Sequence, residues 1–462
     1  MRKIRSIEKV FLLFLLMPFF AFSQCWKEIS TGRWNSAGLK NDGTIWTWGN
    51  NMYGQLGDGT NVNKSNPIQL GNGAGWKNIN STTNADHVLG IQSNDVLWGW
   101  GSNSYAQLGG NMGDHKMSPV ELGDVGGFKS ISPGGAHSLI IKGNGTLWAR
   151  GDNTYGELGD GTITDRYFYV QIGTDTNWSN AIAGTFYTIA LKTNGTLWAW
   201  GANFQGQLGD GTNTVRTSPV QIGTSSEWKS IAVGGNHNLA IKTDGTLWAW
   251  GYNTYGQIGD GSVTNKNVPV QIGTDTNWKS IAAGVNHSLA IKTDGTLWLW
   301  GNNDSGQLGD GTIVNKHVPF QITAATDWKI AAGGAYHTLA LKTDGSLWSW
   351  GYNSSGQLGD GTDVYKLSPV AVNCPATMTL QVVENNIKNY EITLYPNPAK
   401  TSFTVKNLSG IKTVKIYNEE GRLIGSYINS NIINVQSLPQ GVYWVKIEDT
   451  EGKLIIRKLI KN

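Results

Sequence analysis

Cysteines, long apolar runs and helical periodicity are all scarce in this chain of 462 residues. It contains two cysteines, and after residue 20 no segment is apolar enough to cross a membrane. The apolar residues of its central region show no 3.6-residue period. These absences exclude a disulfide-dense scaffold, a polytopic membrane protein and a helical bundle.

The chain also lacks an excess of basic charge once its N-terminus is set aside. It has 36 Lys and Arg against 33 Asp and Glu, but residues 1–23 alone carry a net charge of +3. Residues 376–462 carry about +4, which leaves residues 24–375 at about −4. A nucleic-acid interface needs a basic surface that neutralises phosphates, so we predict no nucleic-acid partner.

Tryptophan and glycine, in contrast, are abundant, with 21 and 61 residues, and an internal repeat accounts for the excess. A Trp-x-Trp-Gly step recurs about every 50 residues, and a second aromatic anchor recurs in phase with it. The steps begin at Trp46, Trp98, Trp148, Trp198, Trp248, Trp298 and Trp348, and the third has Arg150 in place of its second Trp. The second anchors are Trp26, Trp76, Phe128, Trp178, Trp228, Trp278 and Trp328. Two anchors with one period of this size indicate a propeller, a solenoid or another repeat array.

Each repeat unit offers about four short strands, as the unit from Val268 to Asp310 illustrates. His287–Lys292 and Thr296–Trp300 alternate in polarity on either side of Asp294-Gly295. An Asp-Gly pair in this setting is a strong hairpin signal, and we expect both of its residues to take positive φ. Four short strands make one propeller blade. The sequence therefore predicts an all-β fold with a seven-bladed β-propeller over residues 24–375.

The two ends of the repeat region predict how the ring closes. The first unit begins at the strand of Trp26, whereas the last unit ends on an extra strand, Ser368–Val372, which we expect to complete the first sheet. Superposing both ends on the sixth unit places Cys25 and Cys374 three residues apart across a turn. A disulfide between them is therefore expected in an oxidising compartment, with two free thiols as the alternative.

The segments outside the repeats predict targeting and export. Residues 1–23 combine a basic start, an apolar stretch and a small residue before Gln24, which is typical of a cleaved secretory signal peptide. A short membrane anchor is the alternative interpretation. Residues 376–390 are predicted to form a linker. Residues 391–462 contain short alternating runs separated by turns, which predict a small antiparallel β-sandwich.

The repeat units carry the pattern Gly-x-x-His-Ser-Leu-Ala-Ile-Lys-Thr-Asp-Gly-Thr-Leu-Trp-x-Trp-Gly-x-Asn-x-x-Gly-Gln-Leu-Gly-Asp-Gly-Thr. Over residues 26–375 they resemble the regulator of chromosome condensation repeat, which implies a seven-bladed β-propeller. The eukaryotic founder of that family is a nucleotide-exchange factor for a small GTPase and binds chromatin. This chain is acidic and lacks an insertion for an exchange wedge, so the resemblance implies neither role. A secreted bacterial β-lactamase inhibitor with similar repeats indicates that such rings can bind proteins.

The C-terminal segment, residues 391–462, is similar to the type A sorting domain of the type IX secretion system. The similarity rests on Leu394–Pro398, Val414–Tyr417, Leu438–Tyr443 and the basic end Ile456–Lys461. It implies export across both membranes and a secreted or outer-surface location. It also implies the type IX secretion machinery as a partner and no transmembrane anchor in the mature chain.

The recurring titratable residues are interpreted as structural. A histidine recurs at one repeat position, where Asn35 and Tyr187 replace it in two units, so we expect each ring to satisfy local backbone groups. An aspartate recurs in Gly-Asp-Gly loops, but one carboxylate is too few for calcium, which takes about six to eight oxygens. No cluster of acids stands out from the repeat. We therefore predict no catalytic residue, no metal and no cofactor. The histidines are His87, His137, His237, His287 and His337, and the aspartates are Asp58, Asp160, Asp210, Asp260, Asp310 and Asp360.

Positions that break the repeat are the candidate binding residues, because a ring needs one site rather than seven. They cluster in units two to four and add aromatic side chains, which are enriched in binding hot spots. Ordinary sequence drift is the alternative interpretation. The candidates are Arg150, Tyr167, Phe168, Tyr169, Phe186 and Tyr187.

Together these features predict a secreted or surface-displayed protein that binds an extracellular protein or glycan through a propeller face and catalyses no reaction. The alternatives are an extracellular hydrolase or lyase, or an inhibitor of an extracellular enzyme, on the same scaffold.

Overall fold

The computed structural model describes residues 25–375 except 72 and 126, and residues 392–462 except 407, 409, 419–421 and 451–453. The side chains of residues 124 and 125 are also left undescribed. The chain divides into two compact units, residues 1–375 and 376–462. The predicted signal peptide and the predicted linker lie outside the described residues. The described part of the chain contains no helix that could span a membrane.

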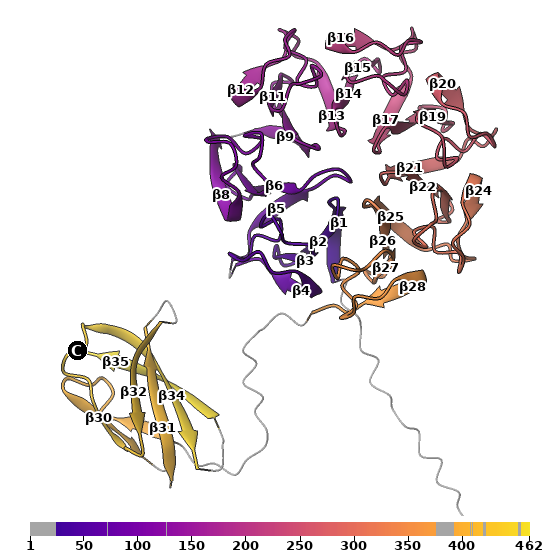
Figure 1. Cartoon of the computed structure of the whole chain (residues 1–462). Helices are drawn as coiled ribbons and strands as arrows, with labels where there is room; N and C mark the ends of the chain where they lie inside the picture. The colour runs from indigo at the N-terminus through magenta and orange to yellow at the C-terminus, as the bar shows by residue number, and fades with distance from the viewer. Residues whose placement is uncertain are drawn as a thin grey trace, which may run out of the picture. The chain divides into compact units, whose positions relative to one another are not determined.

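The first unit is a ring of seven four-stranded antiparallel sheets, so the predicted all-β propeller is confirmed (Figure 1). Within each blade the strands pair in sequence order. The blades consist of β1 Trp26–Thr31, β2 Asn35–Lys40, β3 Ile45–Gly49 and β4 Lys64–Gln69; β5 Trp76–Asn80, β6 His87–Gln92, β7 Val96–Gly101 and β8 Lys116–Val125; β9 Phe128–Pro133, β10 His137–Lys142, β11 Leu147–Gly151 and β12 Arg166–Gln171; β13 Trp178–Ala183, β14 Tyr187–Lys192, β15 Leu197–Gly201 and β16 Arg216–Gln221; β17 Trp228–Val233, β18 His237–Lys242, β19 Leu247–Gly251 and β20 Lys266–Gln271; β21 Trp278–Ala283, β22 His287–Lys292, β23 Leu297–Gly301 and β24 Lys316–Gln321; β25 Trp328–Gly333, β26 His337–Lys342, β27 Leu347–Gly351 and β28 Lys366–Val372.

The hairpin between the second and third strands of a blade is held by its Asp-Gly pair. In blade 6 the carboxylate of Asp294 accepts the Thr296 N–H at 3.0 Å, and Gly295 takes a φ of 79°. Asp294 keeps an ordinary φ, so the prediction that both turn residues take positive φ is wrong. Only the glycine needs the left-handed region, because the aspartate acts through its side chain.

The ring does not close as the sequence predicted. Blade 1 is complete in β1–β4, and β28 pairs with β27 in blade 7, so the prediction that the last strand completes the first sheet is wrong. The cause is the pairing order within the repeat. In blade 6, Trp298 pairs with Gln321, on the strand that follows it in the chain. Each blade therefore begins at the second anchor and ends with the strand that follows the glycine-rich loop, which contains a proline in every blade except blade 3.

The seam between blades 7 and 1 is closed by a disulfide and by side-chain packing. The predicted disulfide between Cys25 and Cys374 is confirmed, with a Cα–Cα distance of 6.1 Å. The Trp48 indole donates a hydrogen bond to the Gln357 carbonyl across the seam at 3.0 Å. One buried apolar cluster spans both blades and contains Trp26, Trp46, Trp48, Leu339, Leu341, Leu347 and Val372.

Buried histidines of five blades bond to the next blade. His87 Nε2 lies 2.9 Å from the Ser138 hydroxyl, which itself donates to the Gln107 carbonyl at 2.8 Å. Because the hydroxyl proton is committed to that carbonyl, the hydroxyl accepts from a neutral ring protonated on Nε2. Burial lowers the pKa of His87 to about 3. The prediction that these rings satisfy local backbone groups is wrong, since the partner is a hydroxyl of the next blade. The other pairs are His137–Thr188, His237–Ser288, His287–Thr338 and His337–Ser36, at 3.1, 2.9, 3.1 and 3.0 Å.

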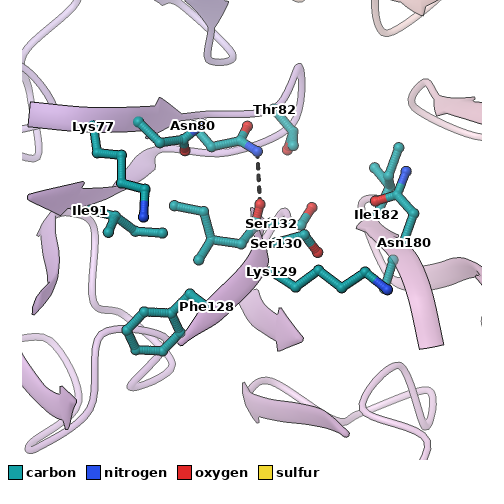
Figure 2. A pocket seen from close by; sticks show the side chains of 13 residues that line it. Lys77, Asn80, Thr82, Ile91, Phe128, Lys129, Ser130, Ser132, Asn180 and Ile182 are labelled. Atoms are coloured by element: carbon teal, nitrogen blue, oxygen red, sulfur yellow. Dashed lines mark hydrogen bonds between the residues drawn. The ribbon is translucent and has the colours of Figure 1, made fainter. Parts of the chain in front are cut away.

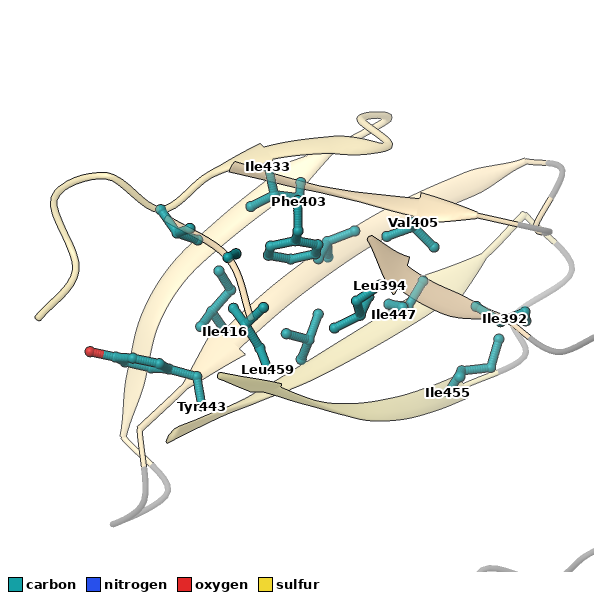
Figure 3. Close-up of a cluster of buried hydrophobic side chains, with 14 of the residues drawn as sticks. Ile392, Leu394, Phe403, Val405, Ile416, Ile433, Tyr443, Ile447, Ile455 and Leu459 are labelled. Carbon is teal, nitrogen blue, oxygen red and sulfur yellow. The ribbon is translucent and has the colours of Figure 1, made fainter. Parts of the chain in front are cut away.

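The second unit is a small sandwich of two antiparallel sheets. Its buried side chains point into the space between the sheets, with Phe403 near the centre (Figure 3). Alternation sets the core, because Val414 and Ile416 are buried while Lys415 between them is not. One sheet contains β29 Thr393–Tyr395, β30 Ser402–Lys406 and β33 Ile432–Asn434, and the other β32 Leu423–Ile428, β31 Ile411–Tyr417, β34 Gly441–Asp449 and β35 Leu454–Lys461.

Candidate functional site

The predicted binding residues lie in two separate places on the propeller. Tyr167 and Phe168 belong to β12, the outermost strand of blade 3 (Figure 1), and are 46% and 76% exposed. Tyr169, on the same strand, is half-buried. Phe186 lies in the loop between β13 and β14 and is 38% exposed. The structure therefore does not bring these aromatic residues together into one patch.

Arg150 is part of the scaffold, which corrects its assignment as a binding residue. Its side chain is buried, and its Nε donates to the Gln107 carbonyl at 3.0 Å. In blade 2 the indole of Trp100 makes the equivalent bond to Gln55 at 3.0 Å. The guanidinium also stacks on the Tyr169 ring at 4.1 Å. Arginine thus replaces the donor that tryptophan supplies in the other blades.

Tyr187 requires the same correction. It stands where five blades have the linking histidine, and its side chain is fully buried. Its hydroxyl lies 3.1 Å from the Asn238 side-chain oxygen in the next blade, so it makes the same kind of inter-blade bond. A buried side chain with this task is not available to a ligand.

One end of the ring carries four repeat positions whose residue type varies between blades. Four positions in each blade face it: the residue before the linking histidine, and the first, third and fourth residues after the Trp-x-Trp-Gly step. We call this end the axial face. The second residue after the step is asparagine in all seven blades and is buried, as at Asn51 and Asn303. Most of the varied side chains at the other four positions are exposed or half-buried, and a few, such as Asp152 and Asn302, are buried.

Aromatic residues are concentrated at those four positions. Trp34, Tyr336 and Tyr352 form a cluster of three rings, in which Trp34 lies 5.4 Å from each tyrosine and the two tyrosines lie 6.5 Å apart. On the other side of the ring, Tyr155 contacts Phe186 at 5.5 Å and Phe204 at 5.4 Å. Each of these rings is exposed or half-buried. The full set is Trp34, Tyr53, Tyr105, Tyr155, Phe186, Phe204, Tyr252, Tyr255, Tyr336 and Tyr352.

Two adjoining depressions open on the axial face. One, of about 450 Å³, extends over the axis and is lined by residues that include Tyr105 and Phe186. The other, of about 320 Å³, lies over the seam of blades 7 and 1 and is lined by Trp34 and Tyr352 among others. Both share Arg33, Tyr53 and Asp86.

An ion pair marks the border between the two depressions. Arg33 Nη1 lies 3.8 Å from Asp86 Oδ2. Burial raises the pKa of Asp86, and the Arg33 charge opposes that shift. The border therefore offers a guanidinium and a carboxylate side by side, with no net charge.

A loop of blade 2 covers the axis beneath this face. Its strands β5 and β6 are joined by residues 81–86, and Trp76 and His87 lie two positions further apart than Phe128 and His137 do. Figure 1 shows this loop reaching the centre of the ring, where Asn84 Nδ2 donates to the Gly234 carbonyl of blade 5 at 3.0 Å. The extra residues thus form a floor for the larger depression.

A further depression, of about 500 Å³, lies between the innermost strands β5, β9 and β13 (Figure 2). Its two lysines are both engaged. Lys77 pairs with Asp95 at 2.7 Å, and Lys129 donates to the Trp178 carbonyl at 3.1 Å. Asn80, drawn with its bond in Figure 2, donates to the Ile131 carbonyl at 2.7 Å. Its lining includes no carboxylate or histidine, so it offers no acid or base at neutral pH.

Asp152 and Glu157 form a carboxyl pair that the sequence analysis missed. In blade 1 the equivalent residues are amides, and Gln55 Nε2 donates to Asn50 Oδ1 at 2.7 Å. Glu157 Oε2 accepts the Tyr155 N–H at 2.8 Å, and its Oε1, without a hydrogen-bond partner among the described residues, takes the place of the amide nitrogen. Burial, together with the Asp152 charge, raises the pKa of Glu157 to about 8.

The prediction that no acid cluster breaks the repeat is therefore wrong. Comparing the seven units position by position would have found the pair, because six blades have glutamine where Glu157 stands. Asp152 and Glu157 are 3% and 0% exposed, so a substrate cannot reach them in this structure. Their effect is on the stability of blade 3.

Comparisons with known proteins agree with this architecture. The RCC1-like domain family matches residues 17–274, and the regulator of chromosome condensation (RCC1) repeat matches residues 294–341 and 344–383. The secretion system C-terminal sorting domain matches residues 393–462. The sorting domain indicates a secreted or outer-surface location and a link to the type IX secretion system.

Individual relatives share only part of their length with this chain. Human E3 ubiquitin-protein ligase HERC2 is 27% identical over 24% of this chain and 2% of its own length. Ultraviolet-B receptor UVR8 of Arabidopsis thaliana is 29% identical over 18% of this chain and 19% of its own length. The chain thus spans less than a fifth of each of these relatives.

Solved structures share the propeller fold. Prp20p of Saccharomyces cerevisiae superposes with a TM-score of 0.65 at 22% identity, over 76% of this chain and 88% of that one. Human WBSCR16 superposes with a TM-score of 0.64 at 22% identity, over 71% of this chain and 94% of that one.

Proposed function

The chain belongs to the RCC1-like domain family and ends in a secretion system C-terminal sorting domain, and from these premises we propose that it is an extracellular binding protein. Its ligand is a protein or a glycan, recognised by the axial face. The protein acts by binding and catalyses no reaction.

The observation that carries this proposal is where the seven blades differ. Inside the ring, repeated side chains bond to the neighbouring blade, as the histidine–hydroxyl pairs do. On the axial face, the residue before the linking histidine changes from Trp34 to Asp86, Ala136 and Phe186. Exposed aromatic residues beside concave, water-filled surface are the features of binding hot spots. A ring whose differences collect at one end supports recognition there.

The titratable groups of the site support binding over catalysis. In the two axial depressions the charged residues are Arg33 and Asp86, and they pair with each other. A hydrolase of glycosidic bonds needs two carboxyl groups that both face the substrate. The carboxyl pair of this ring, Asp152 and Glu157, is buried instead.

The proposal is tested by capture with the purified full chain. Immobilised wild-type protein is exposed to extracellular protein extracts and to a glycan array. We expect a saturable ligand that is lost in Phe186→Asn, which installs the residue that blades 5 and 6 have at this position. Phe168→Ala, on the outer strand of blade 3, is the matched control and should bind as the wild type does.

Other outcomes would redirect the proposal. Ligand capture that survives Phe186→Asn but is lost in Phe168→Ala would move the site to the blade edge. Conversion of a captured glycan or peptide to product would establish the hydrolase or lyase alternative. Loss of an extracellular enzyme's activity at a one-to-one ratio would identify the protein as an inhibitor.

A further inference from the structure

We propose that the smaller axial depression is a sugar-binding site that takes an uncharged residue of a glycan. This inference rests on the proposed function and narrows its ligand class from protein or glycan to a neutral glycan. The site is the depression lined by Trp34, Tyr352, Asn50, Arg33 and Asp86, which we call the Trp34 pocket.

The aromatic wall of the Trp34 pocket is held in place before any ligand arrives. Trp34 is half-buried and packs against Tyr336 and Tyr352, at 5.4 Å from each, and the two tyrosines contact each other at 6.5 Å. Tyr352 is itself supported by Tyr365, with centroids 4.7 Å apart. Fixed rings lose little conformational entropy on binding. The C–H bonds on one face of a pyranose pack against such rings, because C–H groups carry partial positive charge and the ring face is negative.

The polar groups of the pocket match the hydroxyl groups of a sugar. Arg33 presents donors in a planar fork, and Asp86 presents acceptors beside it. Vicinal hydroxyl groups each donate and accept, so one hydroxyl can bond to the carboxylate while its neighbour accepts from the guanidinium. The Arg33 side chain is 53% exposed and that of Asp86 is 18% exposed, so both remain within reach. Asn50 adds an amide on the same wall.

The charge and shape of the site favour a neutral sugar over other ligands. Because Arg33 and Asp86 cancel each other, the pocket gives no net attraction to an anionic sugar or a phosphate. The pocket is concave, with about 320 Å³, and continues past Arg33, Tyr53 and Asp86 into the larger depression. A chain of sugar residues can occupy both, which makes an oligosaccharide the ligand that fills the space.

The test is titration of the full chain with uncharged linear hexasaccharides of glucose, xylose, mannose and N-acetylglucosamine. Intrinsic tryptophan fluorescence and calorimetry report the binding. We expect at least one hexasaccharide to bind at micromolar to millimolar concentration, and Trp34→Ala to weaken it at least about tenfold. Asp86→Asn, which copies blades 5 and 6, should weaken it less, by about three- to tenfold, because an amide keeps one acceptor. Phe204→Ala is the matched control, since Phe204 is an axial aromatic outside both depressions.

The outcomes separate this inference from the proposed function. If no hexasaccharide binds at millimolar concentration to protein that melts normally, or if Trp34→Ala binds as well as Phe204→Ala does, the sugar site is overturned. A protein captured by the wild type and lost in Phe186→Asn would then leave the proposed function standing. If neither a sugar nor a protein binds, both fail. Circular dichroism of each variant confirms that the ring is intact.

Discussion

The interior of the ring and its axial face use the same repeat in opposite ways. Inside, many side chains bond to the next blade, as the histidine–hydroxyl pairs do, and where blade 3 loses its tryptophan, Arg150 supplies the same donor to Gln107. On the axial face, the residue before the histidine position is aromatic at Trp34, Phe186 and Tyr336 and is small or polar in the other four blades. The difference teaches that a substitution in this protein has to be judged by its place in the blade. The interior changes Arg150 and Tyr187 keep a hydrogen bond to the neighbouring blade, whereas axial changes alter the surface that a ligand meets.

The largest expected effect is a loss of the free energy of unfolding at acidic pH, which arises from the buried histidines inside the ring. Burial lowers the pKa of five linking histidines, for example that of His287 to about 3, below the ordinary value of 6.5. The unfolded chain therefore takes up protons first as the pH falls. Stability from these groups is full above pH 6.5 and is lost towards pH 3, by about 1.4 kcal/mol per pH unit for each histidine. Urea denaturation at pH 7 and pH 5 should show a loss of several kcal/mol.

A histidine variant tests whether the buried, neutral histidines cause this pH dependence. His287→Asn copies Asn35 of blade 1 and removes one titrating group, so the pH dependence should become shallower by about one proton. A free energy of unfolding that is the same at pH 7 and pH 5 would contradict the neutral, buried rings.

The second effect is on the seam between blades 7 and 1. The Cys25–Cys374 disulfide closes a loop with a sequence separation of 349. Cys25→Ser with Cys374→Ser should reduce the free energy of unfolding by about 5 kcal/mol, because the unfolded chain regains the closure entropy. Thermal melting with and without reductant measures this, and the double variant should not respond to reductant. If alkylation of the denatured chain modifies both cysteines whether or not reductant is present, the cross-link is ruled out.

The third effect concerns the buried carboxyl pair of blade 3, Asp152 and Glu157. The raised pKa of Glu157 means that its stability contribution is full below about pH 4.5 and is lost as the pH rises through about 8. Glu157→Gln restores the amide of the other blades, which can donate to Asp152. We expect it to match the wild type at pH 5 and to be more stable by a few kcal/mol at pH 9. Gln107→Glu, a glutamine-to-glutamate change at the same position of blade 2, should destabilise the protein at alkaline pH. Equal stability of Glu157→Gln and the wild type at pH 9 would contradict the raised pKa of Glu157.

The smallest effect concerns one loop position at the edge of the axial face. Ala106 has a φ of 58° where the other blades have glycine, such as Gly156 at 77°. Ala106→Gly should be stabilising by up to about 1 kcal/mol, because the left-handed conformation is strained for alanine. Gly156→Ala should be destabilising by about 2 kcal/mol, since its Cβ would lie 2.7 Å from the Thr217 Cα. Chemical denaturation of both variants measures these changes in the free energy of unfolding. Changes of the same sign would contradict the expected strain at Ala106.

The features that were predicted correctly from the sequence are those that follow from its repeat of about 50 residues. Seven blades, four strands per blade and the Cys25–Cys374 disulfide follow from register alone. The pairing of β28 was not predictable in this way, because a strand between two others can pair with either. Arg150 and Tyr187 were misread because a changed residue type does not reveal that its hydrogen bond is kept. The axial face was missed because its residues lie about 50 positions apart in the sequence and only the ring brings them together.

The central claim is that the axial positions carry recognition and the interior positions carry the fold. The most direct test is a triple variant, Trp34→Asn, Phe186→Asn and Tyr352→Asn, in which every new residue already occurs at the same position of another blade. Melting temperature and ligand capture are measured on the same preparation. The account predicts a melting temperature close to that of the wild type and no captured ligand. Full capture by a stable triple variant would contradict it.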